Sequence, residues 1–186
     1  SINPSTVTRV GSLTCSATGS DADGTTPSIT YTWLNLSTKT DLGSGPKLTL
    51  TTKTATKGDV IQCTATATDS YKGSSSASTT VDVTNAKPEL SSVSITPNPA
   101  RSTDTLTCRE GKSSDVDGDR VTVSINWFVN KVRVSTGTTL SPKYFVRGDS
   151  VHCSGVPSDG KENGVEVSSS TVSIGNSLPS IVSVKL

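Results

Sequence analysis

Acidic side chains recur in one short motif at two places in the chain. Segments 21–24 and 115–118 read Asp-Ala-Asp-Gly and Asp-Val-Asp-Gly, and Asp119 extends the second. Carboxylates are hard oxygen ligands, and Ca²⁺ takes about six to eight of them. Both loops are therefore candidate calcium sites, with a simple Asx-type turn as the alternative. The EF-hand pattern fails because no Glu follows at the required position.

Catalytic chemistry finds little support in the sequence. His152 is the only histidine, and it alternates outward from the neighbouring apolar residues, with Gln62 at the matching place earlier in the chain. No nucleophile pattern accompanies it, so a Ser-His-Asp arrangement is not predicted. The sequence predicts a protein that is not an enzyme, has no catalytic residues and requires no cofactor.

The charge balance excludes two classes of partner. The 186 residues carry 17 Lys+Arg and 16 Asp+Glu, a formal net charge of +1. Phosphate recognition needs clustered cations, so nucleic acid is not an expected partner. No apolar run reaches the roughly 18 residues of a membrane helix, so membrane insertion is not expected either. Val, Thr and Ser dominate, which favours strands and turns.

The sequence repeats itself with an offset of 90 to 94 residues. The following landmarks recur in the same order: Leu13-Thr14-Cys15 and Leu106-Thr107-Cys108, Trp33 and Trp127, Gly58-Asp59 and Gly148-Asp149, Cys63 and Cys153. The chain is thus two copies of a unit of about 93 residues.

The repeat and the chain are out of phase. Segment 1–4 matches 94–97, and the tail 179–184 matches 88–93. We therefore predict a first repeat over 1–86 with a truncated opening strand, a second over 87–177, and in 178–186 the opening strand of a third repeat or a donor strand. The first alternative is an excerpt from a longer tandem array, and the second is a polymer closed by the tail strand.

Period-two alternation predicts a β-sandwich in each repeat. The residues expected to share a core face are Leu13, Cys15 and Ala17; Ile29, Tyr31 and Trp33; Ile61, Cys63, Ala65 and Ala67; Leu106 and Cys108; Val121, Val123, Ile125 and Trp127; Val151 and Cys153. Turn residues lie between these runs.

The order Cys…Trp…Cys in both repeats resembles the immunoglobulin fold, in which a disulfide joins two sheets and an indole packs on it. The resemblance implies an all-β protein of two tandem immunoglobulin-like β-sandwich domains, each with one intersheet disulfide. Four cysteines allow three pairings. The repeat selects Cys15 with Cys63 and Cys108 with Cys153, and Trp33 and Trp127 are the core indoles. The tyrosine corner of antibody domains is absent. Disulfides imply an oxidising, extracytoplasmic location.

The full series of motifs resembles the tandem Ig-like, PKD-type and cadherin-like repeats of large bacterial and archaeal surface proteins. This resemblance covers essentially the whole chain. It implies a non-enzymatic, extracellular or cell-surface structural repeat that forms a rod, stalk or fibre of an adhesin-like protein. One alternative is a filament subunit joined head-to-tail by its C-terminal strand. Another is an adhesin module that binds surface glycans or a host, for which the chain has a mild basic cluster: Lys131, Arg133, Lys143 and Arg147.

The immunoglobulin-like arrangement would also gather the acidic loops at one pole, beside the entering linker, as in the calcium junctions of cadherin-like repeats. The candidate calcium ligands of the second repeat are Asp115, Asp117, Asp119, Asp159 and Asn85, and those of the first repeat are Asp21, Asp23 and Asp69.

Two further motifs are candidates for modification or adhesion. Asn35 begins an N-glycosylation sequon. Segment 147–149 reads Arg-Gly-Asp, an integrin-type tripeptide, but 57–59 reads Lys-Gly-Asp at the matching place. The shared Gly-Asp favours a turn that leads into the strand of the second cysteine.

Overall fold

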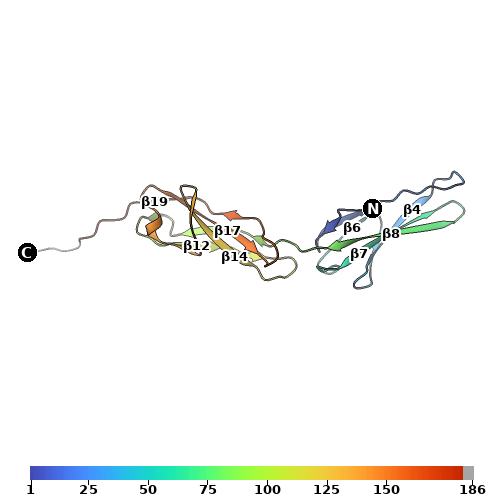
Figure 1. Cartoon of the computed structure of the whole chain (residues 1–186), viewed down its shortest axis with the longest axis horizontal. Helices are drawn as coiled ribbons and strands as arrows, with labels where there is room; N and C mark the ends of the chain where they lie inside the picture. The colour runs from blue at the N-terminus through green and yellow to red at the C-terminus, as the bar shows by residue number, and fades with distance from the viewer. Residues whose placement is uncertain (182–186) are drawn as a thin grey trace, which may run out of the picture. The chain divides into compact units, whose positions relative to one another are not determined.

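The computed structural model describes residues 1–181, which form strands, turns and one short 3-10 turn, η1 (Pro142–Tyr144). The chain divides into two compact units, Ser1–Ala86 and Lys87–Leu186, each with its own hydrophobic core. We call them unit 1 and unit 2 and describe each by itself (Figure 1). No helix in residues 1–181 has the length and hydrophobicity needed to span a membrane. The prediction of an all-β fold is confirmed.

Unit 1 is a sandwich of two sheets. Its strands are β1 (Ile2–Asn3), β2 (Thr6–Val7), β3 (Ser12–Cys15), β4 (Ser28–Asn35), β5 (Thr40–Ser44), β6 (Lys47–Thr49), β7 (Val60–Thr68) and β8 (Ser74–Val83). One sheet has the order β1-β3-β6 and the other β2-β8-β7-β4-β5. The short β2 runs parallel to β8, and the other pairs are antiparallel.

Unit 2 repeats this topology and adds to it. Its strands are β9 (Glu89–Leu90), β10 (Val93–Thr96), β11 (Ala100–Arg101), β12 (Leu106–Glu110), β13 (Ser113–Ser114), β14 (Thr122–Val129), β15 (Val132–Thr136), β16 (Thr139–Leu140), β17 (Ser150–Ser158), β18 (Val167–Ser168) and β19 (Val172–Gly175). The sheets are β10-β12-β16 and β11-β19-β17-β14-β15, with β18 also on β17. The pair β9–β13 has no counterpart among the strands of unit 1.

A disulfide joins the two sheets of each unit, as predicted. Cys15 on β3 bonds to Cys63 on β7, and Cys108 on β12 bonds to Cys153 on β17. The strand order and the disulfide are those of an immunoglobulin-like sandwich, so the fold class is confirmed.

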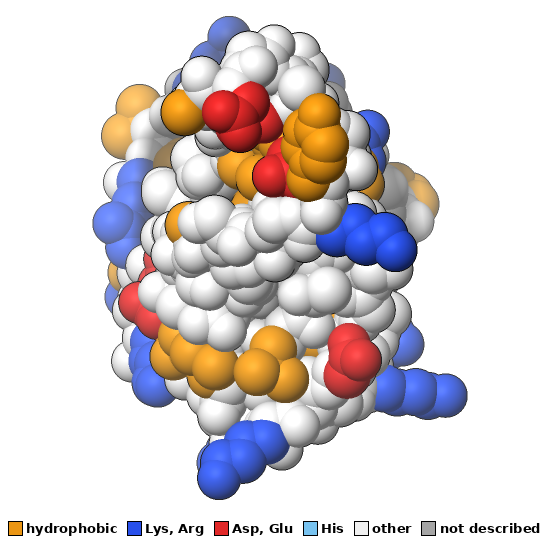
Figure 2. All heavy atoms as spheres, turned by 90° about the vertical axis from the view of Figure 1, so that its right-hand side faces the viewer, with side chains coloured by type: hydrophobic (Ala, Val, Ile, Leu, Met, Phe, Trp, Pro, Cys, Tyr) orange, Lys and Arg blue, Asp and Glu red, His pale blue; other side chains and the backbone are white. Residues whose placement is uncertain are grey.

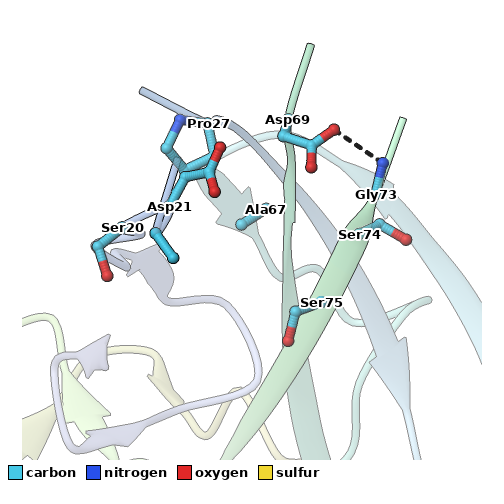
Figure 3. A pocket seen from close by; sticks show the side chains of 9 residues that line it. Ser20, Asp21, Pro27, Ala67, Asp69, Gly73, Ser74 and Ser75 are labelled. Atoms are coloured by element: carbon cyan, nitrogen blue, oxygen red, sulfur yellow. Dashed lines mark hydrogen bonds between the residues drawn. The ribbon is translucent and has the colours of Figure 1, made fainter. Parts of the chain in front are cut away.

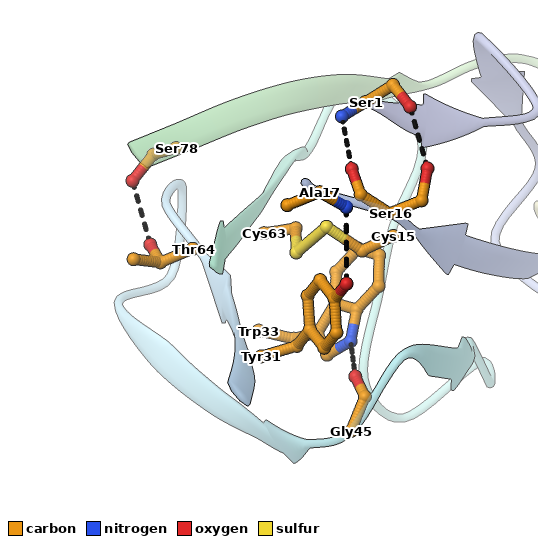
Figure 4. Close-up of a disulfide and its surroundings, with 10 residues drawn as sticks. All are labelled: Ser1, Cys15, Ser16, Ala17, Tyr31, Trp33, Gly45, Cys63, Thr64 and Ser78. Carbon is orange, nitrogen blue, oxygen red and sulfur yellow. Dashed lines mark hydrogen bonds between the residues drawn. A yellow bond between two sulfur atoms is a disulfide. The ribbon is translucent and has the colours of Figure 1, made fainter. Parts of the chain in front are cut away.

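An indole packs beside each disulfide. Trp33 is 1% exposed and lies next to the Cys15–Cys63 bridge, while its Nε1 donates to the carbonyl oxygen of Gly45 at 2.9 Å (Figure 4). In unit 2 the fully buried Trp127 donates to the carbonyl oxygen of Gly137 at 2.8 Å. The hydrogen bond satisfies the one polar atom of each indole, which would otherwise be costly to bury.

The alternation pattern overestimates the core at one end of unit 1. Leu13, Cys15 and Cys63 are buried as expected, but Ala17 is exposed and lies beyond the end of β3. Ala65 and Ala67, on the same expected face, are only half-buried. The physical reason is that no strand of residues 1–86 pairs at this place, whereas in unit 2 the segment that contains β9 pairs with β13 there.

The predicted strand over 178–186 falls mostly outside the described residues. Residues 178–181 are in no strand, and 182–186 lie beyond the part of the chain that the structure describes. Whether the segment acts as an opening or a donor strand therefore stays a prediction.

Candidate functional site

Three carboxylates meet in the loop that follows β13 in unit 2. Asp115, Asp117 and Asp119 each bring one oxygen within 4.8 Å of the others. Oδ1 of Asp115 accepts hydrogen bonds from the backbone N–H of Asp117 at 2.7 Å and of Asp119 at 3.4 Å. Oδ2 of Asp115 is buried without a hydrogen-bond partner among the described residues. The loop therefore gathers hard oxygen atoms at a spacing that suits a divalent cation.

The matching loop of unit 1 is arranged as a turn. Oδ1 of Asp21 accepts from the N–H of Asp23 at 3.1 Å, and Oδ2 accepts from the hydroxyl of Thr25. The Thr25 hydroxyl, and after it the Asp23 N–H, lower the pKa of Asp21. Both bonds stabilise the ionised carboxylate without a metal, which fits the Asx-turn alternative for this loop.

The other acidic candidates also close turns of their own. Oδ1 of Asp69 accepts from the N–H groups of Tyr71 and Gly73, both at 2.8 Å. In unit 2, Oδ1 of Asp159 accepts from the N–H groups of Lys161 and Glu162, both at 2.7 Å. Neither residue belongs to the group of three carboxylates.

Asn85 lies in unit 1, two residues after the end of its last strand, β8. Its Oδ1 accepts from Nζ of Lys57 at 3.0 Å, and its Nδ2 donates to the carbonyl oxygen of Ala86 at 3.0 Å. The side chain thus ties the Lys57 turn to the segment that follows β8.

Asn35, the sequon residue, is fully buried at the end of β4. Its Nδ2 donates to Oδ2 of Asp59 at 2.8 Å and to the carbonyl oxygen of Thr54 at 3.2 Å. Its Oδ1 accepts from the N–H groups of Ser37 and Thr38. Both ends of the amide are occupied inside the unit, which disfavours glycosylation of Asn35 in the folded protein.

The same pairing of Asn with the Gly-Asp turn recurs in unit 2. Nδ2 of Asn130 donates to Oδ1 of Asp149 at 2.8 Å, and Oδ2 of Asp149 accepts from the N–H of Val146 at 2.8 Å. The Val146 N–H, and then Asn130, lower the pKa of Asp149. The acid of the integrin-type tripeptide is therefore already engaged in its own turn. The sequence analysis missed both Asn–Asp pairs. The available signal was the Gly-Asp dipeptide, which stands at the matching position of both repeats.

We expect Asp59→Ala to destabilise unit 1 by about 1–3 kcal/mol at neutral pH, because it leaves the buried Asn35 amide short of an acceptor. Burial raises the pKa of Asp59. The hydrogen bonds from Asn35 and Thr56 and the charge of Arg9 lower this pKa by more than burial raises it, so the net shift is downward. A lowered pKa means that this contribution is complete above the unfolded-state value of about 4 and is lost as the pH falls through the folded-state value.

Urea unfolding of the parent and of Asp59→Ala, at neutral and at acid pH, measures this effect. The free energies of unfolding should differ at pH 7 and converge in acid. Asp82→Ala is the matched control, because Asp82 is exposed on β8. Equal stability of Asp59→Ala and the parent at pH 7 would contradict the assignment.

An elongated hollow marks the end of unit 1 where the core is open. One part, of about 200 Å³, is lined by residues that include Gly19, Ile29, Ala65 and Ala77. The next part, of about 280 Å³, lies between the loop of Asp21 and the β7–β8 turn (Figure 3). The face at this end carries hydrophobic side chains next to acidic ones (Figure 2).

His152 is placed on the outer face of unit 2, as its alternation predicted. Its ring stacks on that of Phe128, with centroids 4.6 Å apart and planes 1° apart. The two residues are direct neighbours across β14 and β17. Their contact is a cross-strand aromatic pair of the kind that stabilises a sheet.

No protein-family model matches the chain, and no curated protein sequence matches it. Solved structures do resemble it. The fibronectin(III)-like modules of Clostridium thermocellum CbhA are 16% identical, with a TM-score of 0.34, over 95% of this chain and 94% of that one. A 1.5-MDa bacterial ice-binding adhesin is 13% identical, with a TM-score of 0.37, over 94% of this chain and 63% of that one. Extracellular cadherin domains 3-6 of protocadherin gamma B2 are 15% identical, with a TM-score of 0.29, over 91% of this chain and 44% of that one.

Proposed function

We propose that the chain is a non-enzymatic, extracellular structural repeat that builds a rod, stalk or fibre at a cell surface. The observation that carries this proposal is the construction of the two units. Each unit closes a small core around one disulfide and one indole, with the cysteines 48 and 45 residues apart. Disulfides persist in oxidising compartments, and small units with little apolar volume depend on them.

Repetition supports the same proposal. In tandem arrays each unit contacts mainly its neighbours, so further copies lengthen the structure without a new fold. The polar groups that the structure brings together serve turns and sheets: the Asn–Asp pairs hold a turn on a strand end, and the aromatic pair lies across two strands. The partners that we propose are neighbouring repeats or subunits arranged head-to-tail.

Immunogold electron microscopy with an antibody against this chain tests the proposal. On intact source cells we expect labelling of the surface or of material projecting from it. Labelling that appears only after the cells are permeabilised would overturn the extracellular assignment. An antibody against a cytoplasmic protein of the same cells is the matched control for leakage.

A second candidate function is a glycan- or host-binding adhesin module. It is favoured by Tyr71, which is 82% exposed at the β7–β8 turn next to Lys72. An exposed aromatic ring beside a cation is a common sugar-stacking element, but one ring offers little area. Saturable binding to one glycan on an array, lost in Tyr71→Ala, would favour the adhesin over the scaffold.

We also propose that the carboxylates of Asp115, Asp117 and Asp119 hold Ca²⁺ in unit 2. The proposal rests on their proximity and on the buried Oδ2 of Asp115. We expect 1 mM CaCl₂ to raise the melting temperature by a few degrees, following about 1–2 kcal/mol of linked binding energy. Asp115→Asn should abolish the shift, while Asp23→Asn in unit 1 should keep it. An unchanged melting temperature of the parent would remove the proposal.

A further inference from the structure

The segment before β10 completes the sandwich of unit 2. β9 pairs with β13, with Leu90 opposite Ser113 and Glu89 opposite Ser114. Between β9 and β10, Ser91 donates its N–H to the carbonyl oxygen of Lys112, and the N–H of Gly111 donates to the carbonyl oxygen of Ser92. Residues 89–96 thus bond along the edge formed by 107–114.

The apolar side chains of this segment fill the end of the core. Leu90 and Val93 are 7% and 6% exposed and belong to the core cluster of unit 2. A methyl group on Gly155 of β17 would lie 2.7 Å from Cδ2 of Leu90 and 3.0 Å from Cγ1 of Val93. The two side chains therefore sit directly over β17, beside Val123.

The equivalent edge of unit 1 has no such cover among the described residues. Segment 17–20 corresponds to 110–113, and within residues 1–181 the backbone of Thr18, Gly19 and Ser20 makes no hydrogen bond. Ala65, which corresponds to Gly155, is half-buried, and Ile29, which corresponds to Val123, lines the 200 Å³ hollow beside it.

The hollow follows the path that the segment takes in unit 2. It runs from Ser1 and Ser16 past Thr18, along Ile29 and Ala65, to the loop of Asp21. Ser1 corresponds to Ser94, which directly follows Val93 in unit 2. The path in unit 1 therefore starts at the place that corresponds to the end of the covering segment in unit 2. We call this surface, with its unpaired edge at 18–20, the unit 1 groove.

We propose that the unit 1 groove binds residues 179–184 of a second copy of this chain as an added strand. Pro179, Ile181 and Val184 match Pro88, Leu90 and Val93, the residues that cover the equivalent groove in unit 2. Ile181 is 86% exposed and the preceding Leu178 is 76% exposed, so apolar area is available for burial. The inference deepens the proposed scaffold function, on which it rests, by naming the partner and the contact.

Strand addition supplies both affinity and register. In unit 2 the N–H of Ser91 donates to the carbonyl oxygen of Lys112, and the N–H of Gly111 donates to that of Ser92. An added strand would correspondingly donate to the carbonyl oxygen of Gly19 and accept from the N–H of Thr18. Ile181 then lies over Ala65 beside Ile29. Main-chain bonds satisfy the free edge, and alternate side chains enter the groove, which is the general mode of β-augmentation. The groove and the added strand are different surfaces of the chain, so the contact is heterologous, and its repetition builds a filament.

The decisive experiment separates groove and tail. The chain lacking 179–186 retains every residue that the two hydrophobic core clusters contain among the described residues, the last of which is Ile174. A fluorescent peptide of residues 177–186 is titrated with this truncated chain and followed by anisotropy. We expect saturable one-to-one binding. The same peptide with Ile181→Asp and Val184→Asp should bind at least about tenfold more weakly, since two apolar side chains are lost from the groove.

A matched pair of variants tests the groove itself. Thr18→Pro removes the N–H that the donor strand needs, whereas Thr18→Ala keeps it. Thr18 is exposed and outside the strands, so both variants retain the unit. We expect Thr18→Pro to abolish peptide binding and Thr18→Ala to leave it within about twofold of the parent.

The full chain gives the second readout. Sedimentation velocity should show masses that grow with concentration for the parent, and a monomer at all concentrations for the Ile181→Asp/Val184→Asp chain. Absence of peptide binding, or equal binding of the two peptides, would overturn the inference. So would a strictly monomeric parent whose own tail occupies its groove, detected as hydrogen-exchange protection of 18–20 that the truncation removes. These outcomes leave the immunogold test untouched, so failure of the contact and failure of the scaffold function can be told apart.

Discussion

Replacing Cys108 and Cys153 together with alanine is expected to destabilise unit 2 by about 4 kcal/mol, a large fraction of the roughly 5–15 kcal/mol by which a domain is stable. The bridge spans 45 residues and joins β12 to β17, the central strands of the two sheets. Without it the unfolded chain regains the entropy that the loop closure removes, while the folded sandwich gains nothing in return.

Differential scanning calorimetry measures this effect, because the variant changes only one of two separate cores. We expect the unfolding transition of unit 2 to move to a much lower temperature and the unfolding transition of unit 1 to stay where it is in the parent. The matched control is Cys15→Ala with Cys63→Ala. It should lower the unfolding temperature of unit 1 by a similar amount, since the loop that this disulfide closes spans 48 residues. A variant that melts like the parent would show that the bridge is dispensable.

Trp127→Ala is expected to cost unit 2 about 3–5 kcal/mol, the range for deleting a fully buried large side chain. The indole fills the space between the sheets beside the disulfide, and its Nε1 satisfies the carbonyl oxygen of Gly137. Alanine would leave a cavity and an acceptor without its donor, and both effects act in the same direction.

Urea unfolding followed by circular dichroism checks this prediction, while the fluorescence of the remaining Trp33 reports separately on the unchanged core of unit 1. Trp127→Phe is the control that keeps most of the apolar volume and loses the hydrogen bond, so it should cost less than alanine. Trp33→Ala should affect unit 1 in the same way. A loss below about 1 kcal/mol for Trp127→Ala would mean that the indole is not a core element.

Most features of the two β-sandwiches could be predicted from the sequence. Alternation placed Leu13, Cys15 and Cys63 on the buried face, and the repeat chose the disulfides that the structure contains. These features depend on local periodicity and on comparison of the halves, both of which are visible in one chain. The acidic loop was visible for the same reason, since Asp115 and Asp117 are neighbours in sequence and meet through one turn.

What the sequence could not provide was the environment of each face. Alternation says which side chains share a face but not whether another segment covers it, so Ala17 and Ala65 were expected to be as buried as their neighbours. The sequence showed Asn35 only as the first residue of a sequon, because its partner Asp59 lies 24 residues away and is brought close only by the fold. The exposure of Ala17 and the burial of Asn35 both depend on which distant segments of the chain cover a face.

The parallel pairing of β2 with β8, and of β11 with β19, has a consequence for how a unit responds to tension. Each pair joins a segment near the start of a unit to its last strand, through Thr6–Val7 with Asp82–Val83 and Ala100–Arg101 with Ile174–Gly175. When the two ends of a unit are pulled apart, parallel neighbours slide along each other, so their bonds are sheared together rather than unzipped singly. Short strands in this orientation act as a clamp that resists extension.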